Sequence, residues 1–243
     1  MRLLVTRPEP DAARTAAALR ARGHDVMLAP LLRIEAEAEA DLGSGPWEGV
    51  LITSANAVRA IAAHPRKDEL VALPLFAVGR RSAEAERAAG FAEVVSADGD
   101  AGDLARLVAT RDRTPQPGVQ VRLPLLYLAG EDRAADVGDM LAAHGIATRT
   151  IVVYRAVAAT ALSPDIKDAL AAGAIDGVLH YSRRSADAFV ALALAALIDI
   201  KKLTIRHYCV SAQAAAPLRD AGAAAVAAET PDEAALLALI DAG

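Results

Sequence analysis

Short apolar runs alternate along the chain with alanine-rich segments in which apolar positions recur at helical spacing. Such runs are typical of strands buried on both faces, and the longer periodic segments are typical of amphipathic helices. The alternation predicts a mixed α/β fold with parallel sheets covered by helices. We expect strands near residues 2–6, 26–34, 49–53, 75–78, 93–96, 125–129, 148–157, 176–181, 205–210 and 224–228. We expect helices near residues 9–22, 55–63, 81–89, 101–110, 134–143, 164–172, 184–197, 212–221 and 231–241.

The same pattern occurs twice, in the order A, B, A′, B′. LLVTRPEPDAARTAAALRARGH from Leu3 is echoed by LLYLAGEDRAADVGDMLAAHG from Leu125, and GVLITSANAVRAI from Gly49 is echoed by GVLHYSRRSADAF from Gly177. Each unit reads as a strand, a polar turn and a helix. A repeat near half the chain length predicts two similar lobes, each close to the usual size of a domain. Two lobes create a cleft, where a ligand is expected.

Two long apolar runs, 26–34 and 148–157, occupy equivalent places in the repeat. We expect both to leave one lobe and enter the other, pairing as a two-stranded β hinge. One domain is then split as 1–34 plus 158–243, and the other, 35–157, is inserted into it. Each lobe is expected to hold a five-stranded parallel sheet. The proline-rich segment 111–124 is expected to be a surface loop.

Composition excludes several classes of protein. Apolar residues make up 54% of the 243 positions, so a large core can be buried, whereas aromatic residues make up 3% and the net charge is −5. An acidic chain with few aromatic residues suits neither nucleic acid nor an anionic membrane. The longest apolar stretch, 189–198, is far shorter than the roughly 20 residues of a membrane span. With no signal-peptide pattern and one cysteine, Cys209, we expect a soluble, cytoplasmic protein without disulfides.

Six predicted strand ends run into helix starts through small polar residues or glycine. In open α/β sheets, ligands bind outside these carboxyl ends, where helix N-termini favour anions. Helix capping explains each hydroxyl residue taken alone. As a set with nearby arginines, they predict a site for a polyanion. The candidates are Thr6, Arg7, Thr53, Ser54, Gly79, Arg80, Arg81, Arg133, Ser182, Arg183, Arg184 and Ser211.

Tyr154 lies within the second hinge run, IVVYRAV, and strand alternation places Val152 and Ala156 on its face. Its phenol is either a donor to a ligand or a packing group, and both interpretations stay open. The chain has no GxGxxG, P-loop or GxSxG pattern, and its histidines lack metal-ligand spacing. We therefore expect no metal or cofactor, and a chemistry that positioning can direct.

Seven segments in order resemble uroporphyrinogen-III synthase over nearly the whole chain. They are LLVTRPEPDA at the start, TSANAVRA at 53–60, AVGRRSAEAERAAGF at 77–91, LAGEDRAAD at 128–136, VVYRA at 152–156, YSRRSADAF at 181–189 and PDEAALLAL at 231–239. The resemblance implies two flavodoxin-like lobes joined by a two-stranded ladder. It also implies a monomeric lyase of porphyrin and heme biosynthesis that cyclises hydroxymethylbilane with loss of water and inversion of ring D.

The resemblance implies roles for particular residues. Tyr154 matches the catalytic tyrosine of the family, and Thr53, Ser54, Ser82, Ser182 and Ser211 match hydroxyl residues of its cleft. Ser211 is followed by Ala212, where many relatives carry a pair of threonines. Two alternatives remain at this point. One is a two-lobed sensor that binds a tetrapyrrole or another polyanion without turnover. The other, a glycosyltransferase-like enzyme, lacks the expected nucleotide-phosphate motif.

Overall fold

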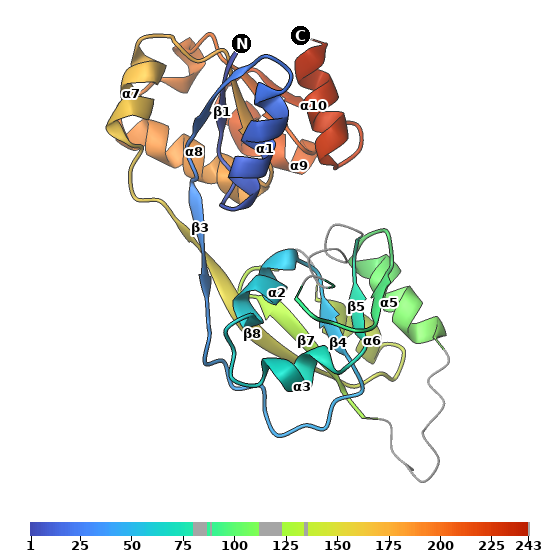
Figure 1. Cartoon of the computed structure of the whole chain (residues 1–243). Helices are drawn as coiled ribbons and strands as arrows, with labels where there is room; N and C mark the ends of the chain where they lie inside the picture. The colour runs from blue at the N-terminus through green and yellow to red at the C-terminus, as the bar shows by residue number, and fades with distance from the viewer. Residues whose placement is uncertain (80–86, 88, 112–122, 134–135, 243) are drawn as a thin grey trace. The chain divides into compact units, whose positions relative to one another are not determined.

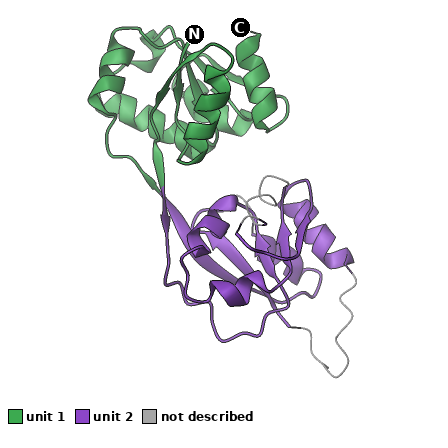
Figure 2. Ribbon diagram, in the orientation of Figure 1, with its two compact units in different colours: residues 1–33, 157–243 green, residues 34–156 purple. Residues whose placement is uncertain are grey.

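The computed structural model describes residues 1–79, 87, 89–111, 123–133 and 136–242 (Figure 1). The chain divides into two compact units (Figure 2). Unit 1 consists of Met1–Arg33 and Val157–Gly243, and unit 2 consists of Ile34–Ala156. Both ends of the chain therefore belong to unit 1.

Unit 1 is built on a parallel sheet with the strand order β11-β10-β9-β1-β2. Its strands are β1 (Arg2–Val5), β2 (Asp25–Leu28), β9 (Gly177–His180), β10 (Arg206–Cys209) and β11 (Ala225–Ala227). Its helices are α1 (Asp11–Arg20), α7 (Pro164–Ala171), α8 (Arg183–Ala195), α9 (Ala212–Asp220) and α10 (Glu233–Asp241), with the 3₁₀ helix η1 (Ile200–Lys202). Helices α1 and α10 share one buried cluster with the sheet, and α7, α8 and α9 share another. Both faces are covered, as a parallel sheet requires.

Unit 2 holds a sheet with the strand order β3-β8-β7-β4-β5-β6. Its strands are β3 (Leu32–Ala36), β4 (Val50–Ile52), β5 (Leu75–Ala77), β6 (Val94–Ser96), β7 (Leu125–Gly130) and β8 (Thr148–Ala158). Its described helices are α2 (Ala55–Ile61), α3 (Lys67–Val71), α5 (Ala101–Thr110) and α6 (Val137–Ala142). Helices α2 and α3 pack on one face, and α5 and α6 pack on the other (Figure 1).

The mixed α/β class with parallel sheets is confirmed, and two details differ from expectation. Within the described residues, unit 1 has the five expected strands, whereas in unit 2 the five parallel strands gain β3 as a sixth. The expected single strand 26–34 is two strands, β2 and β3. The break surrounds Pro30, which has no backbone N–H to donate to a neighbouring strand.

Strands β3 and β8 pair with each other and cross the boundary between the units. Ala159 N donates to Leu31 O at 2.9 Å, and Glu37 N donates to Val153 O at 2.8 Å. Residue numbers increase along β3 as those of their partners in β8 decrease, so the two strands are antiparallel. Arg155 on β8 binds Glu35 on β3 at 3.0 Å, and this hydrogen bond raises the pKa of the Arg155 guanidinium.

Most expected helices are present, because their apolar spacing is a local property of the chain. The expected helix 81–89 and the expected loop 111–124 lie largely outside the described residues. The short helices α3 and η1 were not expected. Cys209 is buried on β10, and burial raises the pKa of its thiol to about 12, which suits the expected strand residue. No helix in the described parts of the chain is long and apolar enough to span a membrane.

Candidate functional site

Two hydroxyl side chains meet where β4 and β7 end in unit 2. The strands pair in register, with Ile52 opposite Leu128, so Thr53 follows β4 at the carboxyl edge of the sheet. The Thr53 Oγ1 atom lies 3.2 Å from the hydroxyl oxygen of Tyr127. Tyr127 is fully buried, and burial raises the pKa of its phenol, so this group stays protonated at neutral pH. Sequence reasoning missed Tyr127, although a tyrosine within the apolar run LLYLAG was a visible signal.

Tyr154 lies on the neighbouring strand β8, opposite Gly130 at the end of β7. A β-bulge interrupts the pairing of the two strands between Ala129 and Gly130. Val153 and Tyr154 are consecutive, yet both pack against the same buried cluster, whereas Val152 is exposed. The expectation that Val152 shares a face with Tyr154 is therefore wrong, because a bulge breaks the alternation of side chains. No described residue hydrogen-bonds to the Tyr154 hydroxyl.

Arg133 lies in the loop that follows β7. Its Nη1 donates to the carbonyl oxygen of Gly130 at 3.0 Å, and its Nη2 lies 3.3 Å from Asp136 Oδ2. The Arg133 side chain keeps 28% of its surface exposed, so it is not fully shielded from solvent. We call Thr53, Tyr127, Gly130, Arg133 and Tyr154 the Tyr154 edge. It combines a partly neutralised cation with a phenol that has no hydrogen-bond partner among the described residues.

Ser54 and Gly79 complete the candidates in the described part of unit 2. Ser54 caps α2, and its Oγ accepts a hydrogen bond from Asn56 N at 3.2 Å. Gly79 follows β5, next to β4 in the sheet, and a Cβ added to it would meet no described neighbour within 4 Å. Arg80, Arg81 and Ser82 lie outside the described residues.

Thr6 and Arg7 at the end of β1 serve the fold of unit 1. Thr6 is fully buried, and its hydroxyl donates to Leu179 O at 2.6 Å. Arg7 Nη1 lies 3.0 Å from Glu233 Oε1, and Nη2 lies 3.3 Å from Asp11 Oδ2. The Arg7 side chain is only 13% exposed. The Thr6 hydroxyl and the Arg7 guanidinium are therefore both engaged by groups of unit 1.

Tyr181 belongs to the same cluster of side chains as Arg7. Its hydroxyl donates to Glu233 Oε1 at 3.1 Å, and its ring lies 4.0 Å from the Arg7 guanidinium carbon. Thr15 on α1 also donates to Glu233 Oε1, at 2.5 Å. Burial raises the pKa of Tyr181 to about 12. We call Arg7, Asp11, Thr15, Tyr181 and Glu233 the Glu233 cluster, and it links β1, α1, β9 and α10.

The remaining candidates of unit 1 begin its helices. Ser182 Oγ accepts from Ser185 N at 3.1 Å at the start of α8, and Ser211 Oγ accepts from Ala214 N at 3.2 Å at the start of α9. Both are N-caps, as the simpler interpretation predicts. Arg183 contacts Asp187 at 3.8 Å, but its side chain is 57% exposed, so it is available to an anion. Arg184 is half-buried.

A pair of buried histidines in unit 1 is a further feature, separate from the candidate residues above. His180 and His207 are buried on β9 and β10, with Nε2 of His180 3.0 Å from Nδ1 of His207. Burial lowers the pKa of both imidazoles, that of His207 to about 4. Among the residues that the structure describes, no three His, Cys, Asp or Glu side chains form a group that could hold a metal.

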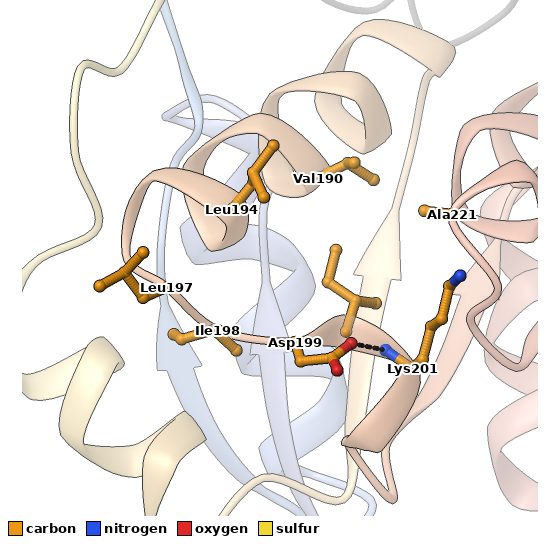
Figure 3. A pocket seen from close by; sticks show the side chains of 8 residues that line it. Val190, Leu194, Leu197, Ile198, Asp199, Lys201 and Ala221 are labelled. Carbon is orange, nitrogen blue, oxygen red and sulfur yellow. Dashed lines mark hydrogen bonds between the residues drawn. The ribbon is translucent and has the colours of Figure 1, made fainter.

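An apolar pocket of about 450 Å³ lies in unit 1 (Figure 3). It is lined mainly by the last turn of α8, by η1 and by the end of α9, among them Leu194, Leu197 and Lys201. Helix C-termini surround it, so it lies at the end of the sheet opposite the strand carboxyl ends. The alkyl chain of Lys201 packs on Gly222, so packing explains why this lysine lies at the pocket wall. The pocket therefore takes no part in the candidate site.

Comparisons with known proteins give a consistent result. The family described as uroporphyrinogen-III synthase HemD matches residues 13–238. A crystal structure of uroporphyrinogen-III synthetase from Helicobacter pylori is similar to the chain with a TM-score of 0.68 and 17% identity, covering 100% of this chain and 99% of the other. A mutant uroporphyrinogen III synthase from Thermus thermophilus is similar with a TM-score of 0.53 and 17% identity, covering 100% and 98%.

No curated protein matches the chain by sequence. At 17% identity the two solved structures support the fold, whereas the family match spans most of the chain and carries the assignment. The chain belongs to the uroporphyrinogen-III synthase family.

Proposed function

We propose that the chain is a uroporphyrinogen-III synthase, a lyase of porphyrin biosynthesis that cyclises hydroxymethylbilane with inversion of ring D. The family match over residues 13–238 is the observation that carries this proposal. The Tyr154 edge supports it, because it offers a hydrogen-bond donor and a cation without a strong nucleophile. The reaction needs a donor to the leaving hydroxyl and a fixed substrate geometry more than it needs a powerful base.

Tyr154 is the proposed catalytic residue. Its hydroxyl has no hydrogen-bond partner among the described residues, and a phenol O–H group is a hydrogen-bond donor. It donates to the terminal hydroxyl of the substrate as the C–O bond breaks, and that hydroxyl leaves as water. The electron pair of the pyrrole nitrogen stabilises the resulting cation. Attack by ring D at its substituted carbon gives the spiro intermediate, which rearranges. Loss of one proton completes the macrocycle and replaces the proton that the Tyr154 phenol donated.

The remaining groups bind and orient the substrate in this proposal. Hydroxymethylbilane carries eight carboxylates, and anions are favoured at helix N-termini and beside arginine. In unit 1, we assign this role to Arg183 and to the starts of α8 and α9 at Ser182 and Ser211. In unit 2, we assign it to Arg133, Thr53, Ser54 and Gly79, and the sequence-based proposal extends to Arg80 and Ser82. The sequence-based proposal also includes Thr6 and Arg7, whose polar groups have partners within unit 1.

The decisive experiment supplies freshly made hydroxymethylbilane to the purified chain without added metal or nucleotide. The products are oxidised and separated as the I and III isomers of uroporphyrin. We expect the III isomer to dominate, whereas a heat-denatured control gives the I isomer from spontaneous closure. Tight binding with only the I isomer would favour a sensor without turnover. The monomeric state and the cytoplasmic location stay predictions, and sedimentation of the purified chain tests the first.

A further inference from the structure

The β-bulge in unit 2 changes the direction in which Tyr154 points. Ala129 pairs with Val152 and Gly130 pairs with Tyr154, so Val153 is an extra residue in β8. Leu126 and Leu128 belong to the cluster under α2, and alternation along β7 places Gly130 on that same side. Because of the extra residue, Tyr154 also lies on that side rather than on the opposite face. Its ring is thereby brought over Gly130.

The space above Gly130 is filled by the phenol of Tyr154. A Cβ atom built on Gly130 would lie 2.7 Å from Cζ and 2.8 Å from the hydroxyl oxygen of Tyr154. Both distances are shorter than real Cβ contacts, so even a methyl group would displace the end of the ring. The φ of Gly130 lies outside the left-handed region, so backbone torsion does not require glycine there. The reason for glycine at this position is the close approach of the phenol.

The backbone around this contact is held by two hydrogen bonds. Arg133 Nη1 donates to Gly130 O at 3.0 Å, and Glu131 N donates to Tyr154 O at 2.9 Å. The strand end therefore resists moving away from an added side chain. The ring of Tyr154 would have to move instead, and its hydroxyl would leave its present place at the carboxyl edge of the sheet.

We propose that Gly130 is a positioning residue, which together with the bulge at Val153 seats the Tyr154 phenol for proton donation to the substrate. The proposal rests on the proposed catalytic role of Tyr154. Gly130 contributes by lacking a side chain, so it acts through Tyr154.

The kinetic test compares Gly130→Ala, Tyr154→Phe and the double variant. Gly130→Ala lowers kcat by about the same factor as Tyr154→Phe, with KM changed less than twofold. The double variant is no slower than Tyr154→Phe alone, because the hydroxyl being displaced is already gone. Multiplied losses in the double variant would overturn the proposal, since they indicate damage independent of the hydroxyl. Gly102→Ala on α5 is the matched control, with its nearest neighbour a capping carboxylate oxygen at 3.2 Å, and it keeps full activity.

A spectroscopic test decides the seating without measuring activity. The chain has four tyrosines, so labelling with 3-fluorotyrosine gives a ¹⁹F spectrum in which Tyr154→Phe identifies the signal of residue 154. That signal shifts in Gly130→Ala and stays in place in Gly102→Ala. An unmoved signal together with wild-type turnover would refute the proposal. Full activity of Tyr154→Phe would refute the catalytic role of Tyr154, while the ¹⁹F shift still decides whether Gly130 seats the ring.

Folding of the variants provides a third readout. If Gly130→Ala does not fold, adding Tyr154→Leu restores folding, because it removes the ring that the new methyl group meets. Failure of this rescue would place the defect elsewhere and overturn the proposal.

Discussion

Each unit has a tyrosine, a threonine and an arginine in its group of candidate or clustered polar side chains, and the two sets have different surroundings. In unit 1, Glu233 accepts hydrogen bonds from Tyr181 and Thr15 and pairs with Arg7. In unit 2, no described residue hydrogen-bonds to the Tyr154 hydroxyl. The difference follows from one carboxylate on α10, because no described carboxylate takes the equivalent place beside Tyr154. The tyrosine hydroxyl is therefore held by a carboxylate in unit 1 and has no described hydrogen-bond partner in unit 2.

The largest expected effect comes from removing that carboxylate. Glu233→Ala leaves Arg7 and two hydroxyls without their shared acceptor, and breaking a buried ion pair costs about 3–5 kcal/mol of unfolding free energy. Glu233→Gln keeps an acceptor for the hydroxyls and costs less. Urea denaturation measures both variants, with Asp187→Ala at an exposed pair as the control. A loss below about 0.5 kcal/mol, the level of surface substitutions, would contradict the comparison.

Lowering the pH should lower the free energy of unfolding of unit 1, because two of its histidines are buried. Burial lowers the pKa of His180 and brings that of His207 to about 4, whereas both imidazoles titrate near 6.5 when unfolded. The unfolded chain then binds more protons below pH 6.5, so stability is full above that pH and falls as pH drops toward 4. We expect a loss of about 2–4 kcal/mol between pH 7 and pH 5.

Hydrogen exchange at both pH values locates this loss. After correction for intrinsic rates, lowering the pH from 7 to 5 should speed amide exchange in β9 and β10 by a larger factor than in β4 and β7. Equal changes in both sheets would show that the histidine pair is not responsible.

Tyrosine substitutions test the comparison directly. Tyr154→Phe should fold normally and turn over a few-fold to about 100-fold more slowly, because only a hydrogen-bond donor is lost. The product should remain mainly isomer III, since substrate geometry controls selectivity. Tyr181→Phe should show the reverse, with a loss of about 1 kcal/mol in stability and nearly unchanged kcat. Equal effects of the two substitutions on kcat would contradict the proposed difference, in which Tyr154 serves turnover and Tyr181 serves stability.

Salt should have the smallest effect. Arg183 is mostly exposed, and screening at physiological ionic strength acts over about 8 Å, so its attraction for a carboxylate weakens as salt rises. We expect KM to rise a few-fold between low and high salt, and Arg183→Ala to reduce that dependence. A KM that does not change with salt would indicate that backbone N–H groups do most of the binding.

Local patterns in the sequence predicted most helices and strands, because apolar periodicity reports which face of an element is buried. The break at Pro30 and the bulge at Val153 were missed, since both depend on how a strand pairs with its neighbours. The surroundings of Arg7 were also invisible, because Glu233 lies 226 residues further along the chain. Tyr127 was visible in the run LLYLAG but was not singled out, because an apolar context is typical of packing. The Tyr154 hydroxyl and the strand-end positions followed from the resemblance and the repeat, which do not depend on such contacts.

The insertion of unit 2 has a consequence for the order of folding during synthesis. β1 pairs with β9, so the pairing of Leu3 with Gly177 can form only after Gly177 has been synthesised. Unit 2, in contrast, is complete once Ala156 has emerged. Domains generally fold as units while the chain emerges from the ribosome. Until more than two thirds of the chain exists, β1 and β2 therefore lack the other three strands of their sheet. These apolar strands are exposed to chaperones and proteases during that interval, while the edge that carries Tyr154 is already formed.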